Sequence, residues 1–239
     1  MAGETAEIWW LDTDGLDAGD WPRLEALLDE AERVRARRFH FDRDRRSYIA
    51  AHALGRRLLS SRAGGEPSAW GFTIGAHGKP EVIGPPGRAR LRLNLSHTRG
   101  MAVAALTEEH DIGVDVEWLG RQPASDELAR RFFAPAECAI LAAAAPDLAE
   151  ETFLSFWTLK EAYIKAVGLG LTQPLDAFAF TLEPLGVRFE PAIADDPACW
   201  RFARFRPTPV HLMALALRHP TPQAVTVTVT AADVAMLCV

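Results

Sequence analysis

Residues 112–118 alternate between two kinds of side chain, and this pattern constrains the fold more than any other in the chain. Because successive side chains of a strand point to opposite faces, one face of the predicted strand is apolar and the other carries a glycine and two carboxylates: Ile112, Val114, Val116 and Trp118 against Gly113, Asp115 and Glu117. At roughly 5 Å and an effective dielectric of about 20, two such carboxylates repel by about 3 kcal/mol. Water, basic neighbours or a hard cation must offset that cost. A solvated strand edge is the commoner explanation, and if a cation is present, oxygen-only ligands favour Mg²⁺ or Mn²⁺ over zinc.

The remaining patterns predict an α+β chain in two halves. Strands are expected at 8–11, 91–96, 101–106 and 225–230, and helices at 20–34, 47–63, 125–133, 135–145 and 150–167, from the spacing of apolar residues. The stretch 75–86, rich in glycine and proline, is expected to be a loop. A polar turn near 108–111 separates an N-terminal half, 1–108, from a C-terminal half, 109–239.

The chain has 239 residues and a formal net charge of −6, yet ten arginines and only two acids fall within residues 33–62. This basic segment indicates a local anionic partner, and the guanidinium fork suits phosphate, although a solvated helix face is the ordinary alternative. The acidic total and the lack of aromatics at stacking spacing argue against nucleic acid. No apolar run nears the ~20 residues of a membrane span, and no secretory signal is visible. Three scattered cysteines fit reduced thiols, so we expect a cytoplasmic protein.

Two further groups of side chains could carry chemistry. Glu161 and Lys165 are four residues apart and share one helix face. A surface ion pair is the simple interpretation, but the apolar flanks indicate a packed helix, where this pair would complete a metal and phosphate site with the two strand carboxylates. Ser96 and His97 end a predicted strand and could donate hydrogen bonds to phosphate. As adjacent strand residues they point apart, which disfavours a Ser–His nucleophile.

Together, and in this order, five motifs resemble the Sfp-type 4′-phosphopantetheinyl transferases: Gly78-Lys79-Pro80, Asn94-Leu95-Ser96-His97-Thr98, Ile112 to Glu117, Arg131-Phe132-Phe133 with Glu137, and Phe156 to Lys165. The similarity spans about residues 33–180. It implies two similar α/β halves packed as a pseudo-dimer in one chain, with a ligand cleft between them, and hence a monomer. It also implies an enzyme that uses coenzyme A and Mg²⁺ to move the 4′-phosphopantetheine arm onto a serine of an acyl or peptidyl carrier protein, releasing 3′,5′-ADP.

The resemblance implies a role for each matching residue. Asp115, Glu117 and Glu161 would hold the metal and Lys165 would contact the diphosphate, so these four form the expected catalytic set. The other matching residues would bind the coenzyme: Arg38, Arg46 and Ser47 at the 3′-phosphate, Lys79 and Pro80 near the adenine and its phosphate, and Ser96 and His97 at the phosphates, His97 chiefly at the 3′-phosphate. Glu32 departs from the family pattern, because a basic residue is expected there.

The sequence leaves two questions open. The base that accepts the serine proton could be Glu161, Glu137 or a metal-bound water, and Glu137 could equally be a first-turn helix acid. The chain could also be a catalytically weak homologue that binds coenzyme A or a carrier, or a hydrolase of CoA-like diphosphates. For carrier binding we expect an apolar surface on the helices between Asp126 and Leu148.

Overall fold

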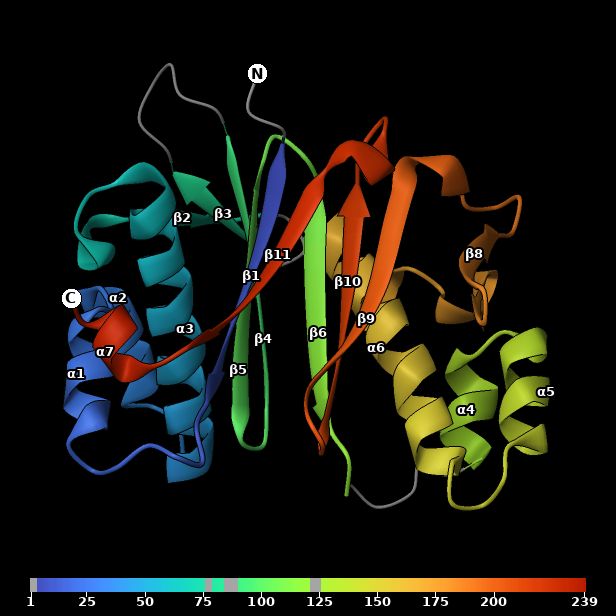
Figure 1. The fold of residues 1–239 in the computed structure, drawn as a ribbon, viewed down its shortest axis with the longest axis horizontal. Helices are drawn as coiled ribbons and strands as arrows, with labels where there is room; N and C mark the ends of the chain where they lie inside the picture. The colour runs from blue at the N-terminus through green and yellow to red at the C-terminus, as the bar shows by residue number, and fades with distance from the viewer. Residues whose placement is uncertain (1–3, 76–78, 84–89, 121–125) are drawn as a thin grey trace.

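The computed structural model describes residues 4–75, 79–83, 90–120 and 126–239. Two sheets stand side by side in the middle of the molecule, with helices on the two outer sides (Figure 1). This arrangement confirms the predicted α+β class. None of the helices in the described part of the chain combines the length and the apolar character that crossing a bilayer requires.

The N-terminal half is a sheet whose outer face is covered by one long helix. Its elements are β1 (Thr5–Asp12), α1 (Asp20–Ala26), α2 (Glu30–Ala36), α3 (Asp42–Ala63), the 3₁₀ turn Pro67–Ala69, β2 (Gly71–Ile74), β3 (Pro80–Ile83), β4 (Leu91–Thr98) and β5 (Met101–Glu108). Strands β1, β5 and β4 pair antiparallel in that order, and β2 and β3 form a separate hairpin. The apolar side of α3 packs on this sheet with fully buried leucines such as Leu54 and Leu58.

The C-terminal half repeats this order of elements. It contains β6 (Ile112–Trp118), α4 (Asp126–Phe132), α5 (Pro135–Ala143), α6 (Ala149–Val167), β7 (Phe178–Leu182), β8 (Leu185–Phe189), β9 (Trp200–Thr208) and β10 (His211–Arg218), with 3₁₀ turns at Gly170–Thr172, Leu175–Ala177, Pro197–Cys199 and Pro222–Ala224. Strands β6, β10 and β9 pair antiparallel in that order, β7 and β8 form a hairpin, and α6 covers the sheet. Each half is therefore a strand, a long helix, a hairpin and two more strands, which is the repeat that two similar halves require.

The two sheets share an apolar core where they face each other. Alternate residues of four strands build it, and all are buried: Ala6, Ile8, Met101, Val103, Ala105, Ile112, Val114, Val116, Met213, Leu215 and Leu217. The apolar face of β6 is therefore the face toward the other sheet. Asp115 and Glu117 lie on the opposite face of β6, which is the face that α6 covers.

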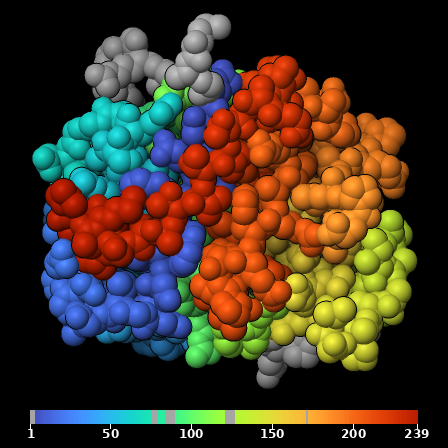
Figure 2. Space-filling view, in the orientation of Figure 1, coloured from blue at the N-terminus to red at the C-terminus, as the bar shows by residue number. Residues whose placement is uncertain are grey.

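The last segment of the chain leaves the C-terminal half. Strand β11 (Thr226–Ala232) pairs in parallel with β1, and α7 (Val234–Leu237) packs into the N-terminal core. Figure 2 shows this segment, in red, lying across the blue N-terminal residues. The predicted C-terminal half, 109–239, therefore needs a correction, because β11 completes the N-terminal sheet and α7 completes its core. Strand β11 covers the edge of β1 that β5 leaves free.

Two local predictions are also wrong. The helix expected over 20–34 is two helices, because Asp29 starts a new one: its side chain accepts a hydrogen bond from the N–H of Glu32 (2.8 Å), and its own N–H donates to the Glu32 carboxylate (3.3 Å). The stretch 75–86 contains strand β3, which begins at Pro80, a position where a strand tolerates proline. The other predicted helices differ from α3, α4, α5 and α6 mainly at their ends.

Candidate functional site

The candidate site lies where α6 crosses β6. A Cβ atom on Gly113 would lie 2.0 Å from the carbonyl oxygen of Ala162 and 2.5 Å from the backbone nitrogen of Ala166. Only glycine lets the helix lie this close to the strand. The close approach places Lys165, on α6, within 2.6 Å of Asp115, on β6.

Strand β4 joins this site from the other half through its side chains. Strands β4 and β6 are edge strands of their sheets, and each edge would leave backbone groups unpaired. The side-chain oxygen of Asn94 accepts a hydrogen bond from the N–H of Val114 (2.9 Å), and Ser96 Oγ accepts one from Val116 (3.3 Å). The polar face of β4 is therefore buried against β6, although its alternating pattern predicts a half-exposed strand. Nothing in the sequence pattern indicates this function of Asn94.

Lys165 is the main partner of Asp115. Its ammonium group donates to Asp115 Oδ1, to Ser96 Oγ (2.9 Å) and to the carbonyl oxygen of Val114 (3.3 Å). Ser96 Oγ also donates to Asp115 Oδ1 (2.9 Å), so Ser96, only 6% exposed, is committed to these contacts. The second oxygen of Asp115, Oδ2, is buried and has no hydrogen-bond partner. An unpaired buried acceptor is costly unless a ligand completes it.

Glu161 and Glu117 add two further carboxylates to this site. Burial raises the pKa of Glu161 to about 7, and the negative charge of Asp115 adds to this effect; Lys165 opposes it and Glu117 reinforces it. These interactions show that the three carboxylates and the lysine share one electrostatic environment. Glu117 also accepts a hydrogen bond from Thr98 Oγ1 (3.4 Å), at the end of β4.

The donor set of this site suits a hard divalent cation. Asp115, Glu117 and Glu161 offer oxygen atoms alone, the ligand type of Mg²⁺ and Mn²⁺, and Oδ2 of Asp115 is a buried acceptor that a cation would satisfy. The oxygens of the three residues do not all lie within 4.8 Å of one another, as expected of three like charges beside a single lysine. The chemistry of these donors fits a magnesium ion, and binding one would require the three carboxylates to draw together.

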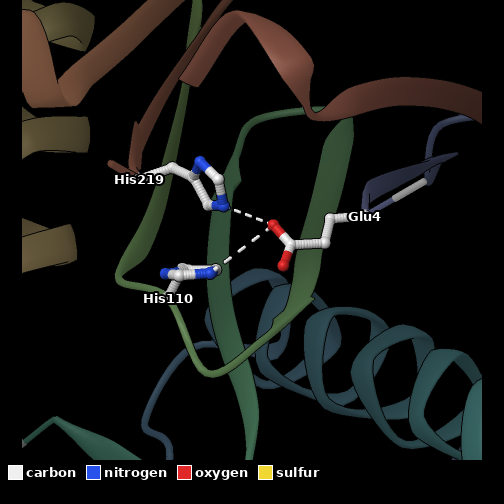
Figure 3. A group of neighbouring side chains, drawn as sticks. All are labelled: Glu4, His110 and His219. Carbon is white, nitrogen blue, oxygen red and sulfur yellow. Dashed lines mark ion pairs between the residues drawn. The ribbon is translucent and has the colours of Figure 1, made fainter. Parts of the chain in front are cut away.

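A second group of metal-ligand side chains lies where the two sheets are joined (Figure 3). One ligand atom from each of Glu4, His110 and His219 lies within 4.8 Å of the others, and no other such trio occurs among the residues that the structure describes. His219 Nδ1 accepts the N–H of Thr221 (2.9 Å), so a neutral ring carries its proton on Nε2, which faces Glu4. A ring bound to metal through Nε2 needs its proton on Nδ1. This group is therefore a hydrogen-bonded contact between segments, and it lies apart from the candidate site.

A basic pocket of about 610 Å³ adjoins the end of β4. Arg46, Ser47 and His97, three of the predicted coenzyme-binding residues, line it. Arg43 and Arg99 also line it, so its arginines outnumber its two acids, Asp14 and Asp44. Because His97 and Thr98 are adjacent and Thr98 contacts Glu117, the pocket opens beside the carboxylate site. The structure thus brings three of the predicted coenzyme-binding residues next to the predicted metal ligands.

Arg38, in the basic segment, and Glu32, just before it, do not line this pocket. Arg38 lines a separate pocket of about 640 Å³, with Arg35 and Phe39. Glu32 is buried and turned inward: its carboxylate accepts hydrogen bonds from Arg56 Nε (2.5 Å) and lies 2.7 Å from His52 Nδ1. Glu32 therefore holds α2 against α3, and its charge does not face the basic pocket.

Lys79 contacts the C-terminal end of α6, next to the candidate site. Its ammonium group donates to the carbonyl oxygen of Ala166 (2.7 Å), one residue beyond Lys165, and so joins the β2–β3 hairpin to the end of α6. Burial lowers the pKa of Lys79 to about 8, and the positive charge of Arg92 adds to the effect. Pro80 is exposed at the start of β3, and Gly78 lies outside the described residues.

Glu137, one of the candidate bases, is sealed inside the C-terminal half. It is 0% exposed and pairs with the equally buried Lys160 (2.8 Å). It also accepts hydrogen bonds from the N–H groups of Ala134 (2.9 Å) and Phe180 (2.8 Å). Glu137 is thus the first-turn acid of α5 and joins α5 to α6 and β7, with no access for a substrate.

Comparison with known proteins gives this site its context. A family model described as the 4′-phosphopantetheinyl transferase superfamily matches residues 111–217. The 4′-phosphopantetheinyl transferase HetI of Nostoc sp. is 33% identical over 196 residues, which cover 81% of this chain and 80% of that protein. The 4′-phosphopantetheinyl transferase Sfp of Bacillus subtilis is 29% identical over 199 residues, covering 83% and 85%. The solved holo-[acyl-carrier-protein] synthase of Thermotoga maritima aligns over 46% of this chain and 62% of that chain at a TM-score of 0.37 and 18% identity, too distant a likeness to bear on the fold.

Proposed function

The chain belongs to the 4′-phosphopantetheinyl transferase superfamily and is an enzyme of that class, and from this premise we propose that it transfers the 4′-phosphopantetheine arm of coenzyme A to a serine of an acyl or peptidyl carrier protein, with Mg²⁺, releasing 3′,5′-ADP. One observation carries the proposal: a buried, unpaired oxygen of Asp115 lies among Glu161, Glu117 and Lys165, beside a basic pocket. Coenzyme A carries three phosphates, and this combination of groups suits a diphosphate and a terminal phosphate.

Asp115, Glu117 and Glu161 would hold the magnesium ion. Bound there, the ion would supply positive charge to the diphosphate of coenzyme A; Mn²⁺ would also suit these ligands. Lys165 is the cation that the chain itself contributes at this point, since its ammonium group already lies against Asp115. In this proposal Lys165 contacts the diphosphate and stabilises the charge that develops on the departing 3′,5′-ADP.

The basic pocket would hold the 3′-phosphate. Arg46, Ser47 and His97 line one pocket, so they can bind one group together. Arg38 lies in another pocket and would contribute less than the family pattern implies. Lys79 and Pro80, beside the end of α6, would lie along the adenosine part of the coenzyme.

The carrier serine needs a proton acceptor. Glu161 has a pKa near 7, so in the metal-free protein it exchanges a proton close to neutral pH. Glu137 is excluded as the base by its burial against Lys160. With Glu137 set aside, Glu161 and a metal-bound water are the two candidates for the base.

The surface of α4, α5 and the turn that follows would receive the carrier. Leu128, Ile140 and Leu148 are exposed there, with Arg130 and Arg131 exposed nearby. Carrier proteins of this kind present an acidic helix around the modified serine, which this mixture of apolar and basic side chains suits. Because both halves are present in one chain, the enzyme would work as a monomer, in the cytoplasm.

The test is a panel of apo carriers from fatty-acid, polyketide and peptide synthesis, incubated with coenzyme A and Mg²⁺ and followed by intact-mass spectrometry. The proposal predicts one mass increase of 4′-phosphopantetheine size on at least one carrier, and none after chelation by EDTA. Carriers that all stay unchanged would contradict it. Release of 3′,5′-ADP in the absence of any carrier would indicate a hydrolase, and coenzyme A binding without product would indicate a catalytically weak homologue.

A further inference from the structure

The turn between β4 and β5, residues 98–100, touches both parts of the candidate site. Thr98, Arg99 and Gly100 line the basic pocket. Thr98 Oγ1 also donates to Glu117 Oε2 (3.4 Å). The position of this one turn therefore affects the pocket and the carboxylate site together.

Two side chains of the C-terminal half hold the turn from the other side. His211, the first residue of β10, lies with Nε2 2.8 Å from the carbonyl oxygen of Arg99. The guanidinium group of Arg99 lies over the ring of Trp118, 4.4 Å from its centroid. His211 and Trp118 stand directly opposite each other on β10 and β6.

The hydrogen bonds of His211 fix both the orientation and the tautomer of its ring. A carbonyl oxygen only accepts, so Nε2 carries the proton and donates it to Arg99. Nδ1 lies 2.7 Å from Thr208 Oγ1, whose hydroxyl donates to it. With the side chain 5% exposed and both nitrogens engaged, the ring is held rigidly.

The ring of His211 also packs against the backbone of the turn. Gly100 has a φ of +77°, and a Cβ atom added to it would lie 2.8 Å from Asp14 Oδ2 and 3.4 Å from His211 Cε1. The turn is therefore enclosed between Asp14 and His211. A change at the ring moves the backbone that carries Thr98 and Arg99.

We propose that His211 is a positioning residue for coenzyme A. It contacts no substrate, and it holds the turn so that His97 and Thr98 face the phosphate in the basic pocket while Thr98 stays on Glu117. This inference rests on the proposed function, because it takes coenzyme A as the ligand of the pocket. It assigns a role in coenzyme binding to a residue of the C-terminal half that lies outside the motifs of the sequence analysis.

The experiment compares His211→Leu, which removes the donor, with His211→Gln, whose amide N–H can still reach the Arg99 carbonyl. Coenzyme A binding is measured by calorimetry, and KM and kcat with an apo carrier. Loss of one hydrogen bond predicts a rise in Kd and KM for coenzyme A of about fivefold to tenfold in His211→Leu, with kcat within about twofold. His211→Gln should stay within about threefold of wild type.

Two further variants separate positioning from general destabilisation. His219→Leu removes an equally buried histidine just beyond the other end of β10, which contacts Glu4 and Thr221 and not the turn. It should leave KM for coenzyme A unchanged. Thr208→Val removes only the hydroxyl that orients His211 and should raise KM about twofold to threefold; it answers the question if His211→Leu does not fold.

The inference is overturned if folded His211→Leu and Thr208→Val bind coenzyme A as wild type does, if His211→Gln loses as much affinity as His211→Leu, or if His219→Leu raises KM equally. The experiment distinguishes failure of this inference from failure of the proposed function. If wild-type protein binds coenzyme A but modifies no carrier, the transfer reaction is refuted and the comparison of coenzyme binding among the variants still holds. Wild-type protein that binds no coenzyme A overturns both.

Discussion

The first strand of each half, β1 or β6, presents side chains of opposite character to the helix that covers it. Asp12 at the end of β1 pairs with the first residue of β5, as Trp118 at the end of β6 pairs with the first residue of β10. Counting back from these ends, Trp9 and Leu11 of β1 stand where Asp115 and Glu117 stand in β6. Trp9 and Leu11 are buried in the apolar core beneath α3.

The strand face beneath the long helix, β1 under α3 or β6 under α6, can therefore serve either packing or chemistry. In the N-terminal half it contributes to the hydrophobic core, and in the C-terminal half it holds like charges that oppose folding. At these equivalent positions one half therefore buries apolar side chains and the other carries charged ones. Sites of this kind are expected to reduce stability in exchange for activity.

The broadest effect should come from adding one methyl group at the closest helix–strand contact, because activity and stability should both fall. In Gly113→Ala the new Cβ would meet backbone atoms of α6, which cannot yield, so the helix must shift and carry Glu161 and Lys165 with it. We expect at least about a 100-fold loss of carrier modification and a loss of about 2–3 kcal/mol in the free energy of unfolding. Activity assays and urea unfolding measure these changes.

Gly55→Ala on α3 is the matched variant of the other half. Its Cβ would meet the ends of Leu95 and Leu93, which are flexible side chains that can rearrange. Its cost should be clearly smaller than that of Gly113→Ala in both assays. Equal costs in the two halves would contradict the view that α6 is fixed by the backbone contact at Gly113.

One substitution on the helix-facing side of β6 and one on the helix-facing side of β1 should give opposite results. Asp115→Asn removes a charge from the site and should lower activity by about 1000-fold, while changing the free energy of unfolding by less than about 1.5 kcal/mol. Leu11→Ala should lower that free energy by about 2–5 kcal/mol and leave the specific activity of the folded protein close to wild type. Activity retained in Asp115→Asn would refute its assignment as a metal ligand.

The halves should also respond oppositely to pH. The pKa of Glu161 is raised to about 7 from 4.5, so the folded metal-free protein binds its proton more tightly than the unfolded chain, and stability falls as pH rises through this window. For Glu32, burial works to raise the pKa, but His52 and Arg56 overcome it and hold the pKa below its usual value. The stability that Glu32 provides is therefore lost as pH falls below about 4.5.

Thermal unfolding in EDTA, measured through both of these pH windows, tests the contrast between Glu161 and Glu32. Glu161→Gln should remove the decline at higher pH, and Glu32→Gln should remove the decline at lower pH. Because a metal needs the ionised carboxylate, half-saturation by Mg²⁺ should require more Mg²⁺ near pH 6 than near pH 8. A Mg²⁺ requirement that is flat across this range would count against Glu161 as a ligand.

The smallest effects should distinguish two arginines of the N-terminal half. Arg46 lines the basic pocket beside His97, whereas Arg38 lines the other one. We expect Arg46→Ala to raise KM for coenzyme A about tenfold and Arg38→Ala less than about threefold. Steady-state kinetics with coenzyme A as the varied substrate measure both, and a larger effect at Arg38 would reverse the assignment.

Local patterns predicted the elements that carry chemistry better than their surroundings. The alternation in 112–118 predicts β6 at its observed ends, and the spacing of Glu161 and Lys165 predicts a shared helix face. The buried face of β4 could not be predicted, because Asn94 and Ser96 are satisfied by β6 of the other half. For the same reason a single sequence could not indicate that Glu32 faces Arg56 or that His211 faces Arg99.

The return of β11 to the side of β1 has a consequence for biosynthesis. Strand β1 is synthesised well before its parallel neighbour β11, so the N-terminal sheet stays one strand short until β11 has also left the ribosome. Pairing across so long a stretch of chain slows folding, and meanwhile an open strand edge is exposed to other molecules. Cutting the chain between its halves would not yield two independent units, because the second fragment would keep the strand that completes the first.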